Sequence, residues 1–434
     1  MPITMIFLDL ALIYFLLLVV LNYRAHRSVL YPPFIFCAMW LLDLLVIRSG
    51  LIEIDPVHGN TLAIVAAGAT SFSAGGLLSG LVPRKLLCIH LFPLKPKRTR
   101  DFLRNILTIA LLCGLPVLFY QILQISRLGG GGFTILAQAR TEMVAAAQSG
   151  EPIRSLVLDY FTIFSILVCL LFATGKKDWR FWAVTVIAFI ASVLTTGRGW
   201  LLLLIAALAA IRLLQAKQES LRRAIPLLRW PIALFVALYI ALLFTNKDTE
   251  AMTGSTTSIA TFSVLSYIAG PLAAFDRVVQ SPADFMRTSS HTFQFPLHLA
   301  ATLHLIKDYT KAPMLDSFVF VPFPTNVYTV FKFYFLELGI IGALVLLFFV
   351  GLLHSLLYLK AKQGGRFSTY MFAFSIYYVL AVIFDDAYFD IATILRAFAI
   401  GLLYFLMGSM TLRLLPTIQV RSQSKNPRLE ESNI

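Results

Sequence analysis

The chain has 434 residues, of which 59% are hydrophobic and 13% are charged. An ordinary soluble domain has about 45 to 50% apolar and about 25% charged residues, so water cannot be the main solvent of this protein. The formal net charge of +14 does not indicate a nucleic-acid partner. The Lys and Arg residues collect in alternate connections between apolar stretches, as the positive-inside rule requires of a membrane protein.

Apolar stretches of about 20 residues recur along the whole chain, and a helix of this length crosses a bilayer. The sequence therefore predicts an all-α polytopic membrane protein with about eleven transmembrane helices. Their expected positions are about 4–22, 29–47, 60–82, 103–125, 154–174, 181–196, 200–215, 230–245, 336–359, 368–384 and 391–412. The first stretch has no basic segment before it and no cleavage site, so we expect a retained helix and not a signal peptide.

The basic connections all fall on one side of the membrane if the N-terminus is outside and the C-terminus is inside, so that side is expected to be the cytoplasm. All four cysteines lie in apolar stretches or in a basic connection, and no exported disulfide is expected: Cys37, Cys88, Cys113 and Cys169.

This topology divides the chain into six parts. They are N-terminal transmembrane helices (1–125), a periplasmic connection (126–153), central transmembrane helices (154–245), a large periplasmic loop (246–335), C-terminal transmembrane helices (336–412) and a disordered cytoplasmic tail (413–434). In the first connection, apolar residues at helical spacing after Gly129–Gly132 indicate a helix along the membrane surface. In the large loop, short helices are expected at Leu272–Val279 and Leu297–Ile306.

Charged residues at membrane depth are costly and therefore informative: Asp9, Asp43, Asp159, Arg198, Glu337 and Arg396. Asp9 and Asp43 are expected to pair with neighbouring helices in a structural role. Arg396 also needs a partner, for which Glu337, an aspartate among Asp385, Asp386 and Asp390, or a substrate phosphate are candidates.

Arg198 lies in a glycine-flanked turn at residues 196–199, between Gly197 and Gly199. A guanidinium group matches phosphate oxygens, and glycines allow a phosphate to approach the backbone closely. The alternative is that Arg198 only extends from a helix end to the lipid headgroups.

Three of the seven histidines lie close together in the large loop: His291, His298 and His304. A histidine can accept a proton near neutral pH, and a sugar hydroxyl needs such a base to become a nucleophile. A metal site is the competing interpretation, but the separation of His298 and His304 is not the i, i+4 spacing of two ligands on one helical face.

Three motifs in residues 195–342 make the chain resemble the Wzy-type O-antigen and exopolysaccharide repeat-unit polymerases of bacteria. They are the Thr196-Gly197-Arg198-Gly199 turn, the segment Gly270–Asp276, and Pro324–Thr329 leading into Glu337-Leu338-Gly339-Ile340-Ile341-Gly342. The acidic position before the last motif's glycine is often Asp in that family and is Glu337 here.

The resemblance implies a metal-independent glycosyltransferase without a cofactor, at the periplasmic face of the bacterial inner membrane. A growing glycan would leave undecaprenyl pyrophosphate for a sugar hydroxyl of the next lipid-linked repeat unit. Three sets of residues follow from it: Arg198, Gly197 and Gly199 with Arg287 or Arg396 for the pyrophosphate; His291, His298, His304 or Glu337 for the acceptor proton; and Asn326, Tyr328 and Asp276 for the glycan. Membrane lipid and a chain-length regulator are the further partners implied.

Three other functions fit parts of the sequence. A metal-dependent glycosyltransferase would need an outer acidic pair, for which Glu53 and Asp55 are the early candidates. An O-antigen ligase would use almost the same chemistry with another acceptor. A flippase or other transporter usually has paired halves with broken helices at corresponding positions, and no such symmetry is visible.

Overall fold

The structure is a computed structural model of the whole chain. It describes residues 3–83, 97–128, 135–149, 156–195, 198–217, 219–229, 232–233, 256–286, 289–307, 309–310, 316–384, 388 and 391–407.

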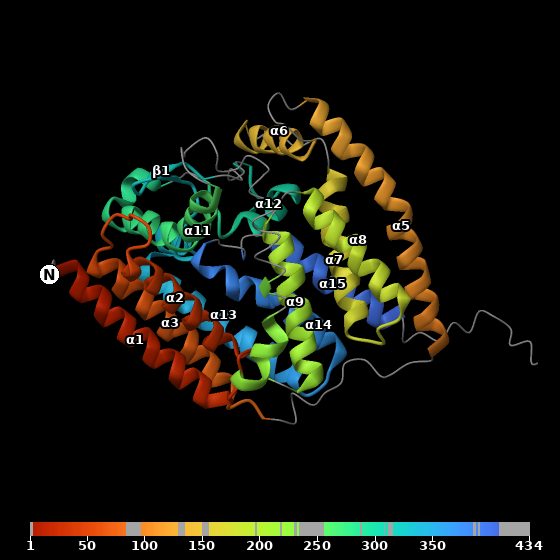
Figure 1. Cartoon of the computed structure of the whole chain (residues 1–434), viewed down its shortest axis with the longest axis horizontal. Helices are drawn as coiled ribbons and strands as arrows, with labels where there is room; N and C mark the ends of the chain where they lie inside the picture. The colour runs from red at the N-terminus through yellow and green to blue at the C-terminus, as the bar shows by residue number, and fades with distance from the viewer. Residues whose placement is uncertain are drawn as a thin grey trace, which may run out of the picture.

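The described residues are almost entirely helical (Figure 1). The main α-helices of the described residues are α1 (Ile3–His26), α2 (Pro32–Ser49), α3 (Gly59–Ser79), α5 (Lys97–Leu128), α6 (Ile135–Ser149), α7 (Leu156–Ala173), α8 (Trp179–Leu194), α9 (Arg198–Ala216), α11 (Thr256–Gln280), α12 (Gln294–Thr302), α13 (Phe331–Lys362), α14 (Arg366–Leu380) and α15 (Ile391–Met407). Two 3-10 helices, η2 (Pro282–Phe285) and η3 (Ala381–Ile383), and two strands, β1 (Val319–Phe320) and β2 (Pro324–Thr325), complete the described elements. The strands form an antiparallel hairpin that pairs Val319 with Thr325.

Seven of these helices are long and apolar enough to cross a membrane: α1, α2, α3, α5, α9, α13 and α14. Three shorter apolar helices, α7, α8 and α15, correspond to further expected spans. The prediction of an all-α membrane protein is therefore confirmed at this level. The expected span at 230–245 lies almost entirely outside the described residues, so the number eleven stays a prediction.

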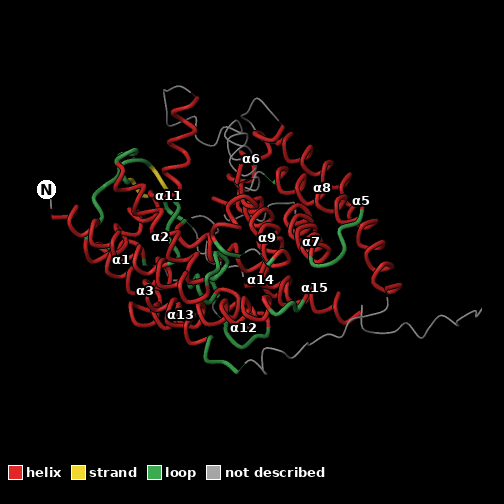
Figure 2. The backbone as a smooth tube through the Cα atoms, turned by 60° about the horizontal axis from the view of Figure 1, so that its bottom comes forward, coloured by secondary structure: helices red, strands yellow, loops and turns green. Residues whose placement is uncertain are grey.

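The helices form two groups (Figure 1, Figure 2). Helices α1, α2 and α3 pack together with α13, while α7, α8, α9, α14 and α15 lie beside them and α5 lies along the far edge. The contact between α3 and α13 is the most extensive one between two described helices. A Cβ atom built on Gly75 would lie 2.0 Å from the carbonyl oxygen of Phe348, and one on Gly351 would lie 2.2 Å from that of Phe72. Small residues thus let the two backbones touch.

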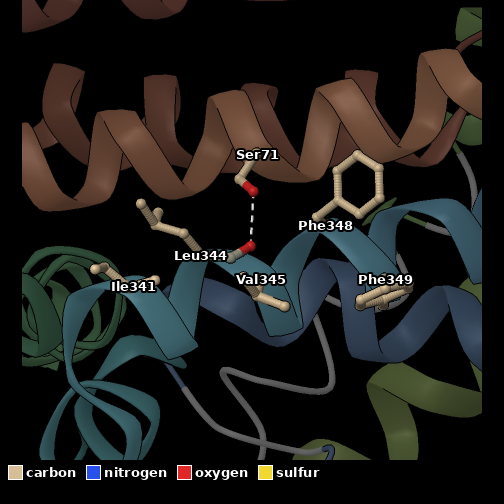
Figure 3. A pocket seen from close by; sticks show the side chains of 6 residues that line it. All are labelled: Ser71, Ile341, Leu344, Val345, Phe348 and Phe349. Carbon is tan, nitrogen blue, oxygen red and sulfur yellow. Dashed lines mark hydrogen bonds between the residues drawn. The ribbon is translucent and has the colours of Figure 1, made fainter.

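An apolar hollow of about 470 Å³ lies on the same pair of helices (Figure 3). Its lining is Ser71 of α3 and Ile341, Leu344, Val345, Phe348 and Phe349 of α13. Ser71 Oγ is its polar atom and donates a hydrogen bond of 2.6 Å to the carbonyl oxygen of Leu344. No acid, base or cation lines this hollow, so it offers no group for chemistry.

The large loop differs from its prediction in the length of one helix. The expected piece at Leu272–Val279 is the final part of α11, which has 25 residues and begins at Thr256. Ser, Thr, Gly and Pro residues interrupt the apolar pattern of α11, so the sequence predicted only the apolar final part of this helix. The second expected piece corresponds to α12, although His304 lies beyond its end with φ +57°. In the first connection, the expected helix is α6.

Helix α13 begins at Phe331, five residues before its expected start, and it is broken at Gly339 (φ 67°, ψ −178°). This backbone conformation is accessible essentially only to glycine. The break separates a short first segment, which carries Lys332 and Glu337, from the long apolar segment that follows.

Asp9 and Asp43 differ in their hydrogen-bond partners. Arg48 Nε donates to Asp9 Oδ1 at 2.6 Å, which confirms that Asp9 pairs with a neighbouring helix. The same prediction for Asp43 is wrong, because neither carboxyl oxygen of this fully buried residue has a hydrogen-bond partner among the described residues.

Candidate functional site

Polar side chains gather at one end of the helix bundle, where the β1–β2 hairpin lies; we call it the hairpin end. Helices α3 and α13 begin there, the end of α11 is bound to the start of α3, and the segment before α12 is bound to α13 (Figure 1). Helix α9 begins at the same end, since Gly199 approaches Tyr377 of α14, and η3 after α14 accepts a hydrogen bond from Val330 at the start of α13. The sequence-predicted site residues come from these elements and their connections.

The Glu337 carboxylate fastens the segment before α12 to α13. Its oxygens accept hydrogen bonds from Ser290 Oγ at 2.7 Å, from the backbone N–H of His291 at 2.6 Å and from that of Thr292 at 3.1 Å. Hydrogen bonds to a carboxylate are about twice as strong as neutral ones. With these donors on its lone pairs, Glu337 is better suited to holding this segment than to removing a proton.

His291 is the one histidine of the three that joins this cluster. Its ring lies on Phe333 with centroids 3.6 Å apart and planes 2° from parallel. His298 is exposed on α12 with its ring 5.5 Å from that of Tyr309, and His304 is exposed beyond the end of α12. The three histidines therefore have different surroundings, although they are close in sequence.

A buried ion pair lies one turn from Glu337 along α13. The Lys332 side chain is 2% exposed, and its Nζ lies 2.9 Å from Asp316 Oδ2 and 3.4 Å above the ring of Tyr328. Tyr328 is 4% exposed and donates from its hydroxyl to the carbonyl oxygen of Ser317. Because Lys332 covers one ring face, Tyr328 stabilises the loop before α13 in this conformation, and a sugar could reach it only after a rearrangement. Asn326, between β2 and α13, is half-buried.

Asp276 of α11 is bound to the start of α3. Its Oδ1 accepts from the backbone N–H of His58 at 3.0 Å and from Thr61 Oγ1 at 2.5 Å, while its Oδ2 lies 2.8 Å from His58 Nδ1. The Asp276 side chain is 6% exposed, whereas that of His58 is 56% exposed. Asp276 is therefore the buried partner of an exposed histidine, and its expected contact with a glycan stays a prediction.

His58 is not among the residues predicted from the sequence, because its partner Asp276 lies 218 positions away. The available signal was local: a histidine directly before a Gly and an Asn, at the start of an apolar stretch and after Asp55-Pro56. Lys332 and Asp316 were overlooked for a similar reason, since a Lys beside an apolar helix usually extends to the headgroups.

The arginines of the predicted pyrophosphate site are only partly described. Gly197, the side chain of Arg198 and all of Arg287 lie outside the described residues. A Cβ atom on Gly199 would lie 2.8 Å from the Tyr377 hydroxyl, so a glycine is needed where α9 begins. Arg396 Nη2 donates to the hydroxyl of Tyr160 at 3.2 Å, and its guanidinium lies 4.5 Å above the ring of that residue.

Asp55, an early candidate for a metal ligand, forms an ion pair with Arg277 at 2.6 Å. Among the described residues, no group of three or more His, Cys, Asp or Glu side chains could hold a metal ion.

Comparisons of the chain with known protein families, with curated proteins and with solved structures find no match.

Proposed function

We propose that this protein is a membrane glycosyltransferase that polymerises oligosaccharide repeat units at the periplasmic face of the bacterial inner membrane. In this proposal the chain crosses the membrane about eleven times, with its N-terminus in the periplasm and its C-terminus in the cytoplasm, and the hairpin end faces the periplasm. The observation that carries it is the hydrogen bond from the backbone N–H of His291 to Glu337 near the start of α13. This contact lies next to buried Lys332 and at one end of the apolar helices. This arrangement concentrates acid–base groups where a lipid-linked sugar leaves the membrane.

The proposed reaction transfers a growing glycan between two lipids. The bond between C1 of the glycan and undecaprenyl pyrophosphate breaks, a hydroxyl oxygen at the non-reducing end of the next lipid-linked repeat unit bonds to C1, and its proton passes to a base. Arg198, with Arg287 or Arg396, would stabilise the charge on the departing pyrophosphate. Gly197 and Gly199 would let the phosphate approach the backbone.

The resemblance offers four residues for the acceptor proton: His291, His298, His304 and Glu337. The geometry supports different tasks for them, since Glu337 holds a segment, His291 lies against Phe333, and the other two are exposed. No cofactor enters the proposal, and its partners are the lipid-linked substrates, membrane lipid and a chain-length regulator.

Reconstitution of the purified protein with a lipid-linked repeat unit tests the proposal. Wild-type protein should produce a ladder of longer glycolipids on a gel, without moving substrate across the bilayer. Arg198→Lys should abolish the ladder because Lys lacks the fork geometry, whereas Arg212→Lys, an exposed position further along α9, should not.

Three outcomes would contradict the proposal. An inactive wild-type protein with authentic substrate would exclude polymerisation. Transfer only to a non-lipid-linked acceptor would indicate a ligase, and substrate movement without extension would indicate a flippase.

A further inference from the structure

An exposed histidine with a buried carboxylate behind it lies at the start of α3. The His58 side chain is 56% exposed, and Asp276, with a 6% exposed side chain, faces its Nδ1 at 2.8 Å. Asp–His pairs of this kind hold an imidazole ring in one orientation, so that its other nitrogen meets the substrate. The predicted site does not include this pair: Asp276 was expected to contact the glycan, and His58 was not among the expected residues.

The hydrogen bonds of Asp276 determine the tautomer of His58. Asp276 Oδ1 accepts hydrogen bonds from the backbone N–H of His58 and from the hydroxyl of Thr61, and Oδ2 of the same carboxylate is an acceptor that faces His58 Nδ1. A bare Nδ1 would place two acceptors against each other, so Nδ1 carries the proton and donates it to Asp276 Oδ2. The lone pair of neutral His58 is then on Nε2, on the exposed side of the ring.

The backbone around His58 is held from both sides, which gives the ring a defined position. The Arg277 guanidinium, next to Asp276 on α11, forms an ion pair of 2.6 Å with Asp55. The backbone N–H of Asp55 donates to the carbonyl oxygen of Val321 in the hairpin. A base must be held within a narrow range of positions to act efficiently, and such supports provide this.

The pair is also connected to the cluster on α13. Phe275, the neighbour of Asp276 on α11, stacks on Phe331 with centroids 5.8 Å apart and meets the edge of Phe335 at 6.0 Å. Those residues belong to the same short segment of α13 that carries Lys332 and Glu337. The pair therefore lies at the hairpin end, on elements that pack against the candidate site.

We propose that His58, positioned by Asp276, accepts the proton of the acceptor hydroxyl. This inference rests on the proposed glycosyl transfer and adds a residue that the resemblance does not include. The hydroxyl proton moves to His58 Nε2, the hydroxyl oxygen bonds to C1 of the glycan, and the pyrophosphate leaves with the electrons of the broken bond. The imidazolium then releases its proton to water.

Extension assays on variants test the inference, with single-unit glycolipid as substrate. His58→Gln should lower the rate by about 100-fold or more, as expected for loss of a general base. Added imidazole should restore part of the rate to His58→Ala and none to His58→Gln, in which the side chain fills the space. A His58→Gln protein that retains most of the wild-type rate overturns the inference, while the activity of the wild type keeps the proposed function intact.

Asp276 needs a separate control because it also supports the start of α3. Asp276→Asn keeps the shape but donates to Nδ1 and so imposes the other tautomer, whereas Thr61→Val removes a hydrogen bond of Asp276 that does not involve His58. We expect a large loss of rate in Asp276→Asn and a small one in Thr61→Val. Equal losses in both would mean that Asp276 acts only through the stability of α3.

Chemical modification provides a measurement that does not depend on activity. Diethyl pyrocarbonate acylates an unprotonated, accessible imidazole nitrogen, and mass spectrometry locates the adduct. His58 should react quickly in the wild type and slowly in Asp276→Asn, while buried His354 serves as the internal control. An unchanged rate at His58 in Asp276→Asn would contradict the assigned tautomer.

Discussion

Glu337 Oε1 accepts a hydrogen bond of 2.6 Å from the backbone N–H of His291, and this contact joins the segment before α12 to the first turns of α13. Glu337 lies two residues before Gly339, where the regular geometry of α13 is interrupted. The position of His291 thus depends on a residue that the sequence suggested as a base in its own right.

Glu337→Gln should release the segment at 289–293. The amide keeps an acceptor at only one of the two oxygen positions and turns an NH₂ group toward the donor at the other, which is His291 at Oε1 or Thr292 at Oε2, so a hydrogen bond to a charged group worth about 1.5 to 3 kcal/mol is lost. We expect faster backbone hydrogen exchange in this segment and slower glycan extension, measured by mass spectrometry and by the gel assay. Glu53→Gln, at an exposed carboxylate, is the matched control and should change neither. Unchanged exchange in Glu337→Gln would remove the fastening role.

The Lys332–Asp316 pair should make a large contribution to stability. Lys332→Met leaves Asp316, which is 12% exposed, without its ammonium partner, and the loss of one member of a buried pair costs about 3 to 5 kcal/mol. Adding Asp316→Asn should recover part of that loss. Thermal unfolding in detergent measures the two single variants and the double variant as a cycle.

The Arg48–Asp9 pair provides the comparison, because its side chains are 36% and 40% exposed. Arg48→Met should cost at most about 1 kcal/mol, as is usual for exposed pairs. If Lys332→Met is as mild as Arg48→Met, the buried pair is not a stabilising element.

How much of this could be read from the sequence depends on the distance over which the interactions act. Apolar stretches predicted most helices within a few residues, because membrane insertion is decided by local composition. The pairing of Asp9 with a neighbouring helix followed from the cost of a charge at that depth. The contact between Asp276 and His58 could not be predicted, because a motif in one segment carries no information about a histidine 218 positions away. For the same reason, the sequence offers His291, His298 and His304 as equal candidates for a base, whereas only the backbone of His291 is bound by Glu337 among the described residues.

The close contact of α3 and α13 should not tolerate added methyl groups. Gly75→Ala and Gly351→Ala would each place a Cβ atom within 2.2 Å of a backbone oxygen of the other helix, and the backbones would have to separate. We expect a loss of about 1 to 3 kcal/mol in each, which is the usual cost of overpacking. Gly175→Ala, where the nearest atom would be 3.5 Å away, should leave the melting temperature unchanged. Equal melting temperatures for all three variants would show that the helices are not in backbone contact.

The orientation of the hairpin end decides whether any of its side chains can act on a periplasmic substrate. Phe320, which is 65% exposed, lies in strand β1 of the hairpin, and exposed Gln363 follows α13 at the opposite end. In a variant without the native cysteines, Phe320→Cys should react with a membrane-impermeant maleimide in cells with an intact inner membrane. Gln363→Cys should react only after that membrane is disrupted, because the basic connections are expected to remain in the cytoplasm. The reverse pattern would place His58, His291 and Glu337 on the cytoplasmic side, where a lipid-linked repeat unit awaiting polymerisation in the periplasm could not reach them.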